Sequence, residues 1–392
     1  MNLKCIKLLN RAWAAGILWT LVFPMGAVGG GTVVGWGYDG LGESTRAASN
    51  VVAIAAGYEQ SLLLLEGGTV AEFGRFRTVS GDLPITVPPD LANVVAVAAG
   101  DSWSLALKAD GSVVQWGVAW YPPGQLDMPA GLTNLAAIFS TSSGQNIALR
   151  ADGTVVAWDY STGLTNVPID LSNVVAITAS FLTYGESPLD LALKPDGTVL
   201  AWDSTGSYVE VPPGWTNIVS ISGGWGELLG LKADGTVVGW PGGLYSDPFA
   251  LTNLANVVAI SASSGNDNHI SLALKADGTV VGWGFNFYGG PLVPPGLSNV
   301  VAVAGSANVN LALVGDGPPV VRASLLSPGW NAEGFSVSVP TQCGRVYRLE
   351  HKSSLADANW VALPLVAGNG GVRQLTDPTA TGAQRFYRVR RW

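Results

Sequence analysis

Aspartate is the residue type whose spacing in this sequence could support catalysis. Paired carboxylates act as general acid and base on polysaccharides, and their separation in three dimensions decides the reaction. Asp-Gly is also a preferred pair for a tight hairpin turn, because a residue of the turn needs a positive φ. The regular recurrence favours two-residue turns, with a carboxylate-based hydrolase or lyase on a polysaccharide or peptide as the alternative. The six aspartates that recur at regular spacing, each before a glycine, are Asp110, Asp152, Asp196, Asp234, Asp277 and Asp316.

Other side chains that could carry chemistry are few. The two histidines, His269 and His351, fall in different parts of the chain, and Cys343 is the only cysteine after the first thirty residues. Residues 266–268 (Asn-Asp-Asn) could supply oxygen ligands, but their spacing does not match a calcium-binding loop. We therefore predict no catalytic residue, no metal site and no cofactor, and we predict that the protein is not an enzyme.

An internal repeat explains the spacing of the aspartates. Each unit contains a segment like residues 94–97 (VVAV), one like residues 105–107 (LAL) and one like residues 236–240 (TVVGW). Seven copies of each segment occur. The third segment ends at aromatic residues 37 to 44 positions apart, which is the length of one four-stranded propeller blade: Trp36, Phe73, Trp116, Trp158, Trp202, Trp240 and Trp283.

The order of the segments predicts how the ring closes. The chain opens with a third-segment strand at residues 32–36, and the last repeat stops after its second segment at Leu313. Pairing of these two strands completes a seventh blade and leaves no long exposed edge. We predict an all-β protein, with a seven-bladed β-propeller over residues 31–321 that is closed by its N-terminal strand. A small β-sandwich-like module follows over residues 322–392, where alternating segments predict half-buried strands.

The repeat resembles that of the regulator-of-chromosome-condensation family, whose units run Gly-x-x-His-Ser-Leu-Ala-Leu, then Asp-Gly, then a strand ending in Trp-Gly. The match is clearest over residues 100–116 and 271–284, and Gln60 and Trp103 replace the family histidine in the first two repeats. The units look most like the short repeats of secreted bacterial members, which include an inhibitory protein. The resemblance implies a binding scaffold. Guanine-nucleotide exchange, known in the family's founding eukaryotic member, is not expected of a chain that reads as exported.

Residues 1–30 read as an export signal. Residues 12–28 form an apolar stretch, followed by small residues that suit a cleavage site. This stretch is shorter than the roughly 20 residues that span a bilayer, so an uncleaved membrane anchor is the weaker alternative. We predict a secreted, periplasmic or cell-surface protein that contacts the membrane only through this segment. The basic residues that precede the apolar stretch are Lys4, Lys7 and Arg11.

Strand parity assigns the predicted loops to two faces. If the strands of a blade alternate in direction, the Asp-Gly turns share one face, and the loops after the first and third strands share the other. The second face is rich in aromatic and acidic residues, which suit protein recognition. The alternative is that these rings fill grooves between blades. The predicted partner-binding residues are Tyr38, Tyr58, Phe76, Asp101, Trp103, Trp120, Tyr121, Tyr160, Tyr184, Glu186, Tyr208, Trp225, Tyr245, Asp267, Phe285, Phe287 and Tyr288.

Charge is unevenly distributed between the two predicted units. Residues 31–321 contain 8 Lys and Arg against 24 Asp and Glu, whereas residues 322–392 contain 9 against 4. An acidic propeller repels nucleic acid, so we expect no nucleic-acid partner. A protein with a basic surface is the favoured partner. We expect a monomeric scaffold that binds such a protein and could inhibit it, with a purely structural surface protein as a third class.

Overall fold

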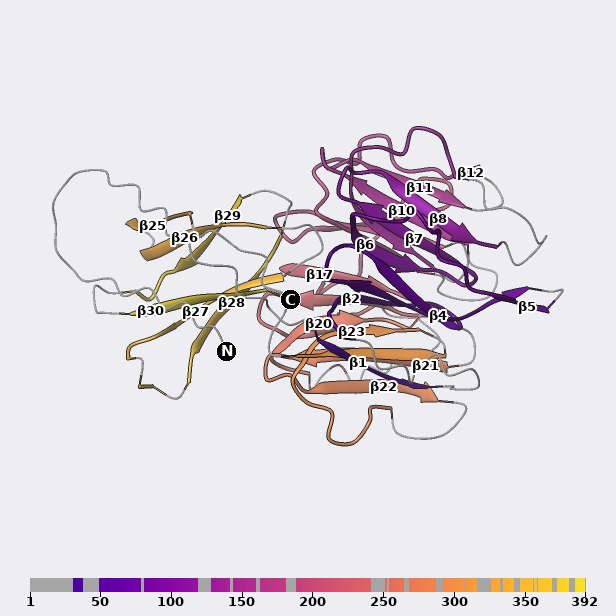
Figure 1. Cartoon of the computed structure of the whole chain (residues 1–392). Coiled ribbons are helices and arrows are strands. Elements are labelled where there is room, and N and C mark those ends of the chain that lie inside the picture. The colour runs from indigo at the N-terminus through magenta and orange to yellow at the C-terminus, as the bar shows by residue number, and fades with distance from the viewer. Residues whose placement is uncertain are drawn as a thin grey trace.

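β-Strands make up the elements of the chain, which confirms the all-β prediction (Figure 1). The predicted signal peptide, Asp316 and Cys343 lie outside the described residues. The structure is a computed structural model that describes residues 31–37, 49–78, 81–118, 128–141, 144–159, 163–180, 188–240, 251, 254–263, 268–286, 292–306, 308–315, 326–331, 334–341, 346–354, 356–357, 359–368, 372–380 and 385–391.

Seven antiparallel sheets of three or four strands lie in the described part of the chain before residue 316. Six of them use strands that follow one another in sequence, and the seventh places the first strand of the chain beside the last strands of the repeat region. The sheets are β2 (Val51–Ala56), β3 (Gln60–Leu65), β4 (Val70–Thr78) and β5 (Gly81–Pro84); β6 (Val94–Ala99), β7 (Trp103–Lys108) and β8 (Val113–Gly117); β9 (Leu135–Ser140), β10 (Gln145–Arg150), β11 (Val155–Asp159) and β12 (Gly163–Leu164); β13 (Ala176–Ser180), β14 (Leu189–Leu193), β15 (Val199–Asp203) and β16 (Tyr208–Val209); β17 (Ile218–Gly223), β18 (Leu228–Lys232) and β19 (Val237–Gly239); β20 (Val257–Ser261), β21 (Asn268–Lys275) and β22 (Val280–Asn286); and β23 (Val300–Gly305), β24 (Val309–Val314) and β1 (Thr32–Gly37).

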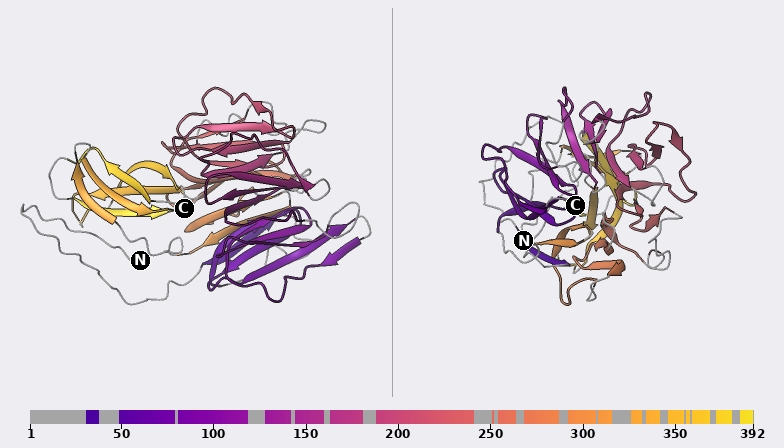
Figure 2. Two further views of the ribbon diagram at one scale, coloured as in Figure 1. Left: turned by 90° about the horizontal axis from the view of Figure 1, so that it is seen from above. Right: turned by 90° about the vertical axis from the view of Figure 1, so that its right-hand side faces the viewer.

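The strands lack polar alternation because neighbouring blades cover both faces of each sheet. In β7, five of the six residues are buried. The first strand of each blade is built from small residues, such as the Val-Val-Ala-Ile-Ala-Ala of β2, because these strands crowd around the centre. First strands contact one another in the order β2, β6, β9, β13, β17, β20 and β23, and β23 also contacts β2. Figure 2 shows the blades arranged around a common centre.

The Asp-Gly turns are three-residue hairpin loops, which corrects the prediction of two-residue turns. In the turn between β7 and β8, the Gly111 N–H donates to the Lys108 carbonyl at 2.9 Å, and the Lys108 N–H donates to the Ser112 carbonyl at 2.8 Å. Only the glycine has a positive φ, 79° at Gly111. This is the geometry of a type I turn followed by a glycine bulge. Asp110 stabilises the turn by accepting from the Ser112 N–H at 2.9 Å, so the turn assignment of this aspartate is confirmed.

An asparagine with a positive φ precedes the first strand of every blade, a feature that the sequence analysis did not identify. Six of these asparagines, all except Asn50, pack against the turn glycine of the preceding blade; at Gly111, for example, an added Cβ would lie 3.1 Å from the Asn134 Cα. Asparagine tolerates this conformation better than other residues with a Cβ. The seven residues, with φ between 55° and 61°, are Asn50, Asn93, Asn134, Asn173, Asn217, Asn256 and Asn299.

The C-terminal residues form two further sheets that share one core. The inner faces of both sheets meet at Phe335, Val337, Leu349, Leu375 and Tyr387, all of which are buried. The Phe335 and Tyr387 rings stack with their centroids 4.0 Å apart. The sheets are β25 (Leu326–Asn331), β26 (Gly334–Pro340) and β29 (Val372–Asp377), and β28 (Val361–Ala367), β27 (Val346–Lys352) and β30 (Phe386–Arg391). We refer to these six strands as the C-terminal module.

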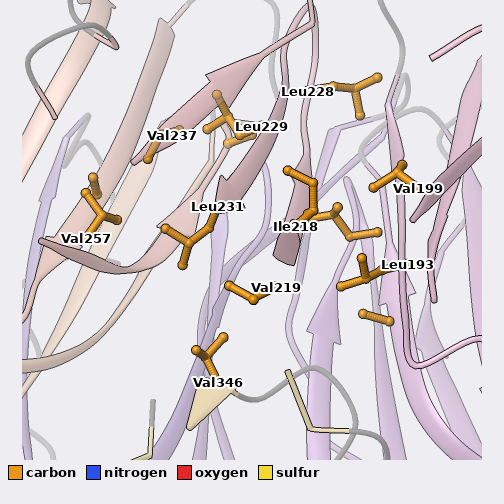
Figure 3. Packing of buried hydrophobic residues seen from close by; sticks show 14 of the residues in the cluster. Leu193, Val199, Ile218, Val219, Leu228, Leu229, Leu231, Val237, Val257 and Val346 are labelled. Carbon is orange, nitrogen blue, oxygen red and sulfur yellow. The ribbon is translucent and has the colours of Figure 1, made fainter. Parts of the chain in front are cut away.

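The C-terminal module packs on the face of the propeller that carries the Asp-Gly turns. Val346, Leu365 and Ala367 of the module belong to one hydrophobic cluster with Val219 and Leu231 of the propeller, and Figure 3 shows Val346 close to Val219. Three hydrogen bonds also join the module to the propeller. In each, the acceptor is the backbone carbonyl of the residue directly before an Asp-Gly pair. The donors and acceptors are the Leu365 N–H and the Ala233 carbonyl (3.0 Å), the Arg390 Nη1 and the Ala276 carbonyl (3.2 Å), and the Arg373 Nη2 and the Pro195 carbonyl (3.5 Å).

The module covers one side of this face. The exposed fraction of one equivalent residue in each blade, the second apolar residue of the first inner segment, shows which blades the module covers. Val219 and Val258 are 8% and 0% exposed beneath the module, whereas Val95, two blades before the covered ones, is 54% exposed. The predicted β module is therefore bound to three consecutive blades, those of β13, β17 and β20.

Replacement of Asn134 tests the role of the positive φ. Asn134→Ala should lower the free energy of unfolding of residues 31–392 by about 1 kcal/mol, because alanine is strained at this φ. Asn134→Gly should stay within about 0.5 kcal/mol of wild type, since glycine adopts this conformation freely. Urea denaturation followed by tryptophan fluorescence measures both. Equal losses in the two variants would show that the side chain, and not the backbone conformation, matters.

Candidate protein-binding face

The structure supports the predicted division into two faces. The Asp-Gly turns, the asparagines before the first strands and the C-terminal module share one face. The loops that follow the first and third strands lie at the opposite ends of the strands, and we call this side the loop face.

Three predicted residues lie half-buried in loops that follow first strands, close to the centre of the loop face. They are Tyr58, Asp101 and Trp225. The backbone ties these loops from one blade to the next: the Tyr58 N–H donates to the Gly100 carbonyl at 3.2 Å, and the Trp225 N–H donates to the Ser263 carbonyl at 2.7 Å. These bonds fix the backbone of two loops whose side chains are partly exposed. We call these residues the inner-loop set.

Two predicted residues are buried and do not belong to an accessible surface, which corrects their assignment. Phe76 lies within β4 and is 4% exposed. Trp103 opens β7, is 1% exposed and donates its Nε1–H to the Ser140 Oγ and to the Asn146 Oδ1 in the next blade. For these two side chains the alternative of packing within and between blades is correct.

The remaining predicted residues divide into one exposed residue and those that the structure does not describe. Tyr208 of β16 is 47% exposed, and its hydroxyl donates to the Asp170 Oδ1 at 2.9 Å. Phe285 belongs to β22, but its side chain is outside the described part. Ten residues lie outside the described residues altogether: Tyr38, Trp120, Tyr121, Tyr160, Tyr184, Glu186, Tyr245, Asp267, Phe287 and Tyr288.

The tryptophans that end the third strands join neighbouring blades. Trp116 donates its Nε1–H to the Glu72 Oε2 of the preceding blade at 2.6 Å, and Trp283 donates to the Glu227 Oε1 at 3.1 Å. Trp36 of β1 donates to the Leu292 carbonyl at 2.9 Å. A buried indole N–H needs an acceptor, so each of these bonds fixes the position of one blade relative to another.

Buried carboxylates beneath the loop face are the polar feature that the sequence analysis missed. Burial raises the pKa of Asp190 to about 8, against the hydrogen bond that its Oδ2 accepts from the Gln145 Nε2 at 2.8 Å. Burial likewise raises the pKa of Glu72 to about 7, against hydrogen bonds from Ser104 and Trp116. Both groups accept hydrogen bonds from an adjacent blade, so they serve packing between blades. Their signal in the sequence is an acid inside a strand, where the repeat elsewhere has a small or neutral residue.

The basic residues of the propeller gather on the face opposite the loop face. Five of its eight Lys and Arg residues stand two positions before an Asp-Gly pair, where they offset the charge of the aspartate; the Lys108 Nζ lies 3.6 Å from the Asp110 Oδ2. The five are Lys108, Arg150, Lys194, Lys232 and Lys275. The carboxylates Asp101, Asp159 and Asp203 stand at the loop-face ends of their strands. Among the described residues, carboxylates therefore stand on both faces of the propeller, and these five basic residues lie on the face of the Asp-Gly turns.

Among the described residues, no group of three or more His, Cys, Asp or Glu side chains is placed to hold a metal ion. None of the described residues forms a helix long and apolar enough to span a bilayer.

The blade geometry and the repeated turns define a β-propeller with the architecture of the regulator-of-chromosome-condensation proteins. The solved structures it resembles include Prp20p from Saccharomyces cerevisiae, with 19% identity, a TM-score of 0.52, and coverage of 74% of this chain and 92% of that chain. Yeast RCC1 (Prp20) bound to Kap60 matches with 17% identity, a TM-score of 0.52 and coverage of 78% and 96%. Human WBSCR16 matches with 16% identity, a TM-score of 0.52 and coverage of 72% and 98%. The predicted resemblance is thereby confirmed at the level of the fold. No known family model and no curated protein matches the sequence.

The raised pKa of Asp190 predicts how stability depends on pH. The folded state holds a proton that an unfolded aspartate releases near pH 4, so the stabilisation is complete below pH 4 and is lost as the pH rises towards 8. The Tm of residues 31–392 should therefore fall between pH 5 and pH 9. Asp190→Asn, which mimics the neutral acid, should reduce this loss of stability by about 2 kcal/mol.

Asp152→Asn is the matched control for the pH series. Hydrogen bonds from Thr154 lower the pKa of Asp152, which is exposed in a turn, so its titration lies below this pH range. Calorimetry on the three proteins measures the Tm. An Asp190→Asn protein with the same pH slope as wild type would show that Asp190 is ionised in the fold.

Proposed function

We propose that this protein is an exported β-propeller scaffold that binds a protein partner through its loop face and is not an enzyme. One observation carries the proposal: the C-terminal module occupies the opposite face through Leu365, Arg373 and Arg390. The loop face is then the end of the propeller that none of these module contacts reaches. It also holds the half-buried inner-loop set of Tyr58, Asp101 and Trp225.

Charge and fold support a protein with a basic surface as the partner. Residues 31–321 carry 24 acidic against 8 basic residues, and opposite potentials accelerate association and favour the matching partner. Structures of the same fold bind proteins: Prp20p was characterised for its binding to Gsp1p and histones, and it was crystallised with Kap60. The scaffold is proposed to act as a monomer outside the cytoplasm and to inhibit its partner by covering the surface that it binds.

A pull-down with matched charge variants tests the loop face. Immobilised residues 31–392 are mixed with envelope and extracellular fractions of the source organism, in parallel with Y58A/D101N/W225A and with D110N/D152N. The first variant removes the inner-loop set, and the second removes two carboxylates from the opposite face. We expect a partner that wild type and D110N/D152N retain, that Y58A/D101N/W225A loses, and that salt elutes because the attraction is screened.

The pull-down also discriminates against the other functions. Melting temperatures of the three proteins confirm that the variants are folded. If Y58A/D101N/W225A retains the partner as wild type does, the loop face is not the binding surface. If no specific protein is captured from any fraction, the scaffold proposal fails in favour of a structural or catalytic role.

We also propose that the seven sheets form one ring closed by the N-terminal strand. The pairing of β1 with β24, in the register Val34 with Ala312, supports this, as does the contact between β23 and β2. Gly31 adds a third argument. Its carbonyl accepts the Val51 N–H at 3.3 Å, just as the turn glycine of every other blade accepts the first N–H of the next blade.

A cross-strand disulfide tests the closure. In a C343S background of residues 31–392, V34C/A312C should oxidise to an intramolecular disulfide that speeds migration on a non-reducing gel and raises the Tm. A disulfide closing so long a loop stabilises by several kcal/mol in the chain-entropy model. The control V34C/N310C places the cysteines two residues out of register and should oxidise slowly. Equal oxidation of both pairs would contradict the proposed register.

A further inference from the structure

Three of the exposed large apolar side chains gather on two adjacent blades. Leu164 is 64% exposed, Ile169 is 105% exposed and Tyr208 is 47% exposed. We call these three residues the rim patch, because Leu164 and Tyr208 lie on the outermost strands of their sheets, β12 and β16. Figure 1 shows β12 on the side of the propeller away from the C-terminal module.

The rim patch is built by equivalent positions of the repeat. Leu164 pairs across its sheet with the buried Trp158, and Tyr208 pairs with the buried Trp202 in the next blade. The two exposed side chains therefore project from matching places on neighbouring fourth strands.

Hydrogen bonds between the two blades hold the patch in place. The Tyr208 hydroxyl donates to the Asp170 Oδ1 at 2.9 Å, and the Asn166 Nδ2 donates to the Ser204 carbonyl at 3.3 Å. Burial and the Asp170 carboxylate raise the pKa of Tyr208 to about 12, so this donor keeps its proton at neutral pH. The patch is a fixed surface on which little side-chain freedom is lost when a partner binds.

Ile169 departs from the repeat at a place where the fold does not require it. The same position, directly after a proline, holds Pro89, Ala130, Pro213 and Pro295 in four other units. A side chain that is 105% exposed contributes no packing within the described chain. Ile169 is thus without a packing reason in the described chain, and with Leu164 and Tyr208 it adds to the apolar surface exposed on two adjacent blades.

The surroundings of the patch are acidic. Asp170 and Glu210, both exposed, flank the apolar side chains. We propose that the rim patch is a docking site for a basic protein segment that carries apolar side chains, which contact Leu164, Ile169 and Tyr208 while its Lys or Arg residues meet these carboxylates. The inference rests on the proposed binding function and assigns a second contact surface to it.

Fluorescence anisotropy with a defined probe tests the proposal. The probe is a labelled nine-residue peptide that alternates Lys with Leu and Phe, compared with a Lys and Ser peptide of equal charge. The Lys, Leu and Phe peptide should bind residues 31–392 more tightly than the Lys and Ser peptide. L164S/I169P, which restores the proline found elsewhere in the repeat, should weaken binding of the apolar probe about tenfold, the change that corresponds to 1.4 kcal/mol.

A matched variant separates the patch from general hydrophobicity. L83S/V95T removes two other exposed apolar side chains of the propeller, which are 43% and 54% exposed, and should leave the affinity unchanged. Equal binding of the two peptides, or equal affinity of wild type and L164S/I169P, would overturn the proposal. Neither result would affect the loop-face pull-down, because Y58A/D101N/W225A leaves the rim patch intact.

Discussion

One backbone hydrogen bond, repeated at every blade junction, determines the geometry of the propeller. The first residue of each inner strand donates its N–H to a glycine carbonyl of the preceding blade, as Leu135 does to Gly111 at 2.9 Å. At six of these junctions two residues with positive φ lie side by side, the turn glycine and the asparagine that starts the next blade. The turn glycine and the asparagine lie too close for a side chain to fit between them. The rotation between blades is therefore set by contact of the two backbones. The hydrophobic clusters between the sheets can then form in the same way at each junction.

This repeated junction also makes the two faces of the propeller different. Tight turns with fixed Asp-Gly and Asn residues occupy one face, and they offer carbonyl groups in equivalent positions. The C-terminal module uses three of these carbonyls, those of Pro195, Ala233 and Ala276. The opposite loops are not part of the junction, so their length and composition vary between blades. In a propeller of this kind, the turns on one face are constrained because they form the junctions between blades. The loops on the other face can change in sequence without disturbing these junctions.

Much of the fold could be predicted from the sequence, because each repeat encodes the same strands and turns. Seven recurrences of a segment like Leu-Ala-Leu and of the terminal aromatic residue indicate the blades even where one copy is irregular, as at Phe73. The asparagines before the first strands recur as regularly, and they would have been found by asking which polar residue each repeat retains. The docking of the module was not predictable, because it depends on backbone carbonyls and on the shape of a surface. No residue type signals these.

The candidate site was harder to predict because position in a loop does not determine exposure. Trp103 replaces the family histidine and looks like a surface anchor, yet Ser140 and Asn146 of the next blade supply acceptors that let it be buried. Ile169 replaces a proline and is fully exposed, with no neighbour that compensates for it. Departure from the repeat alone therefore does not identify function, since a departure can be absorbed by packing. Only a departure that remains exposed is available to a partner, and Ile169 meets this criterion whereas the buried Trp103 does not.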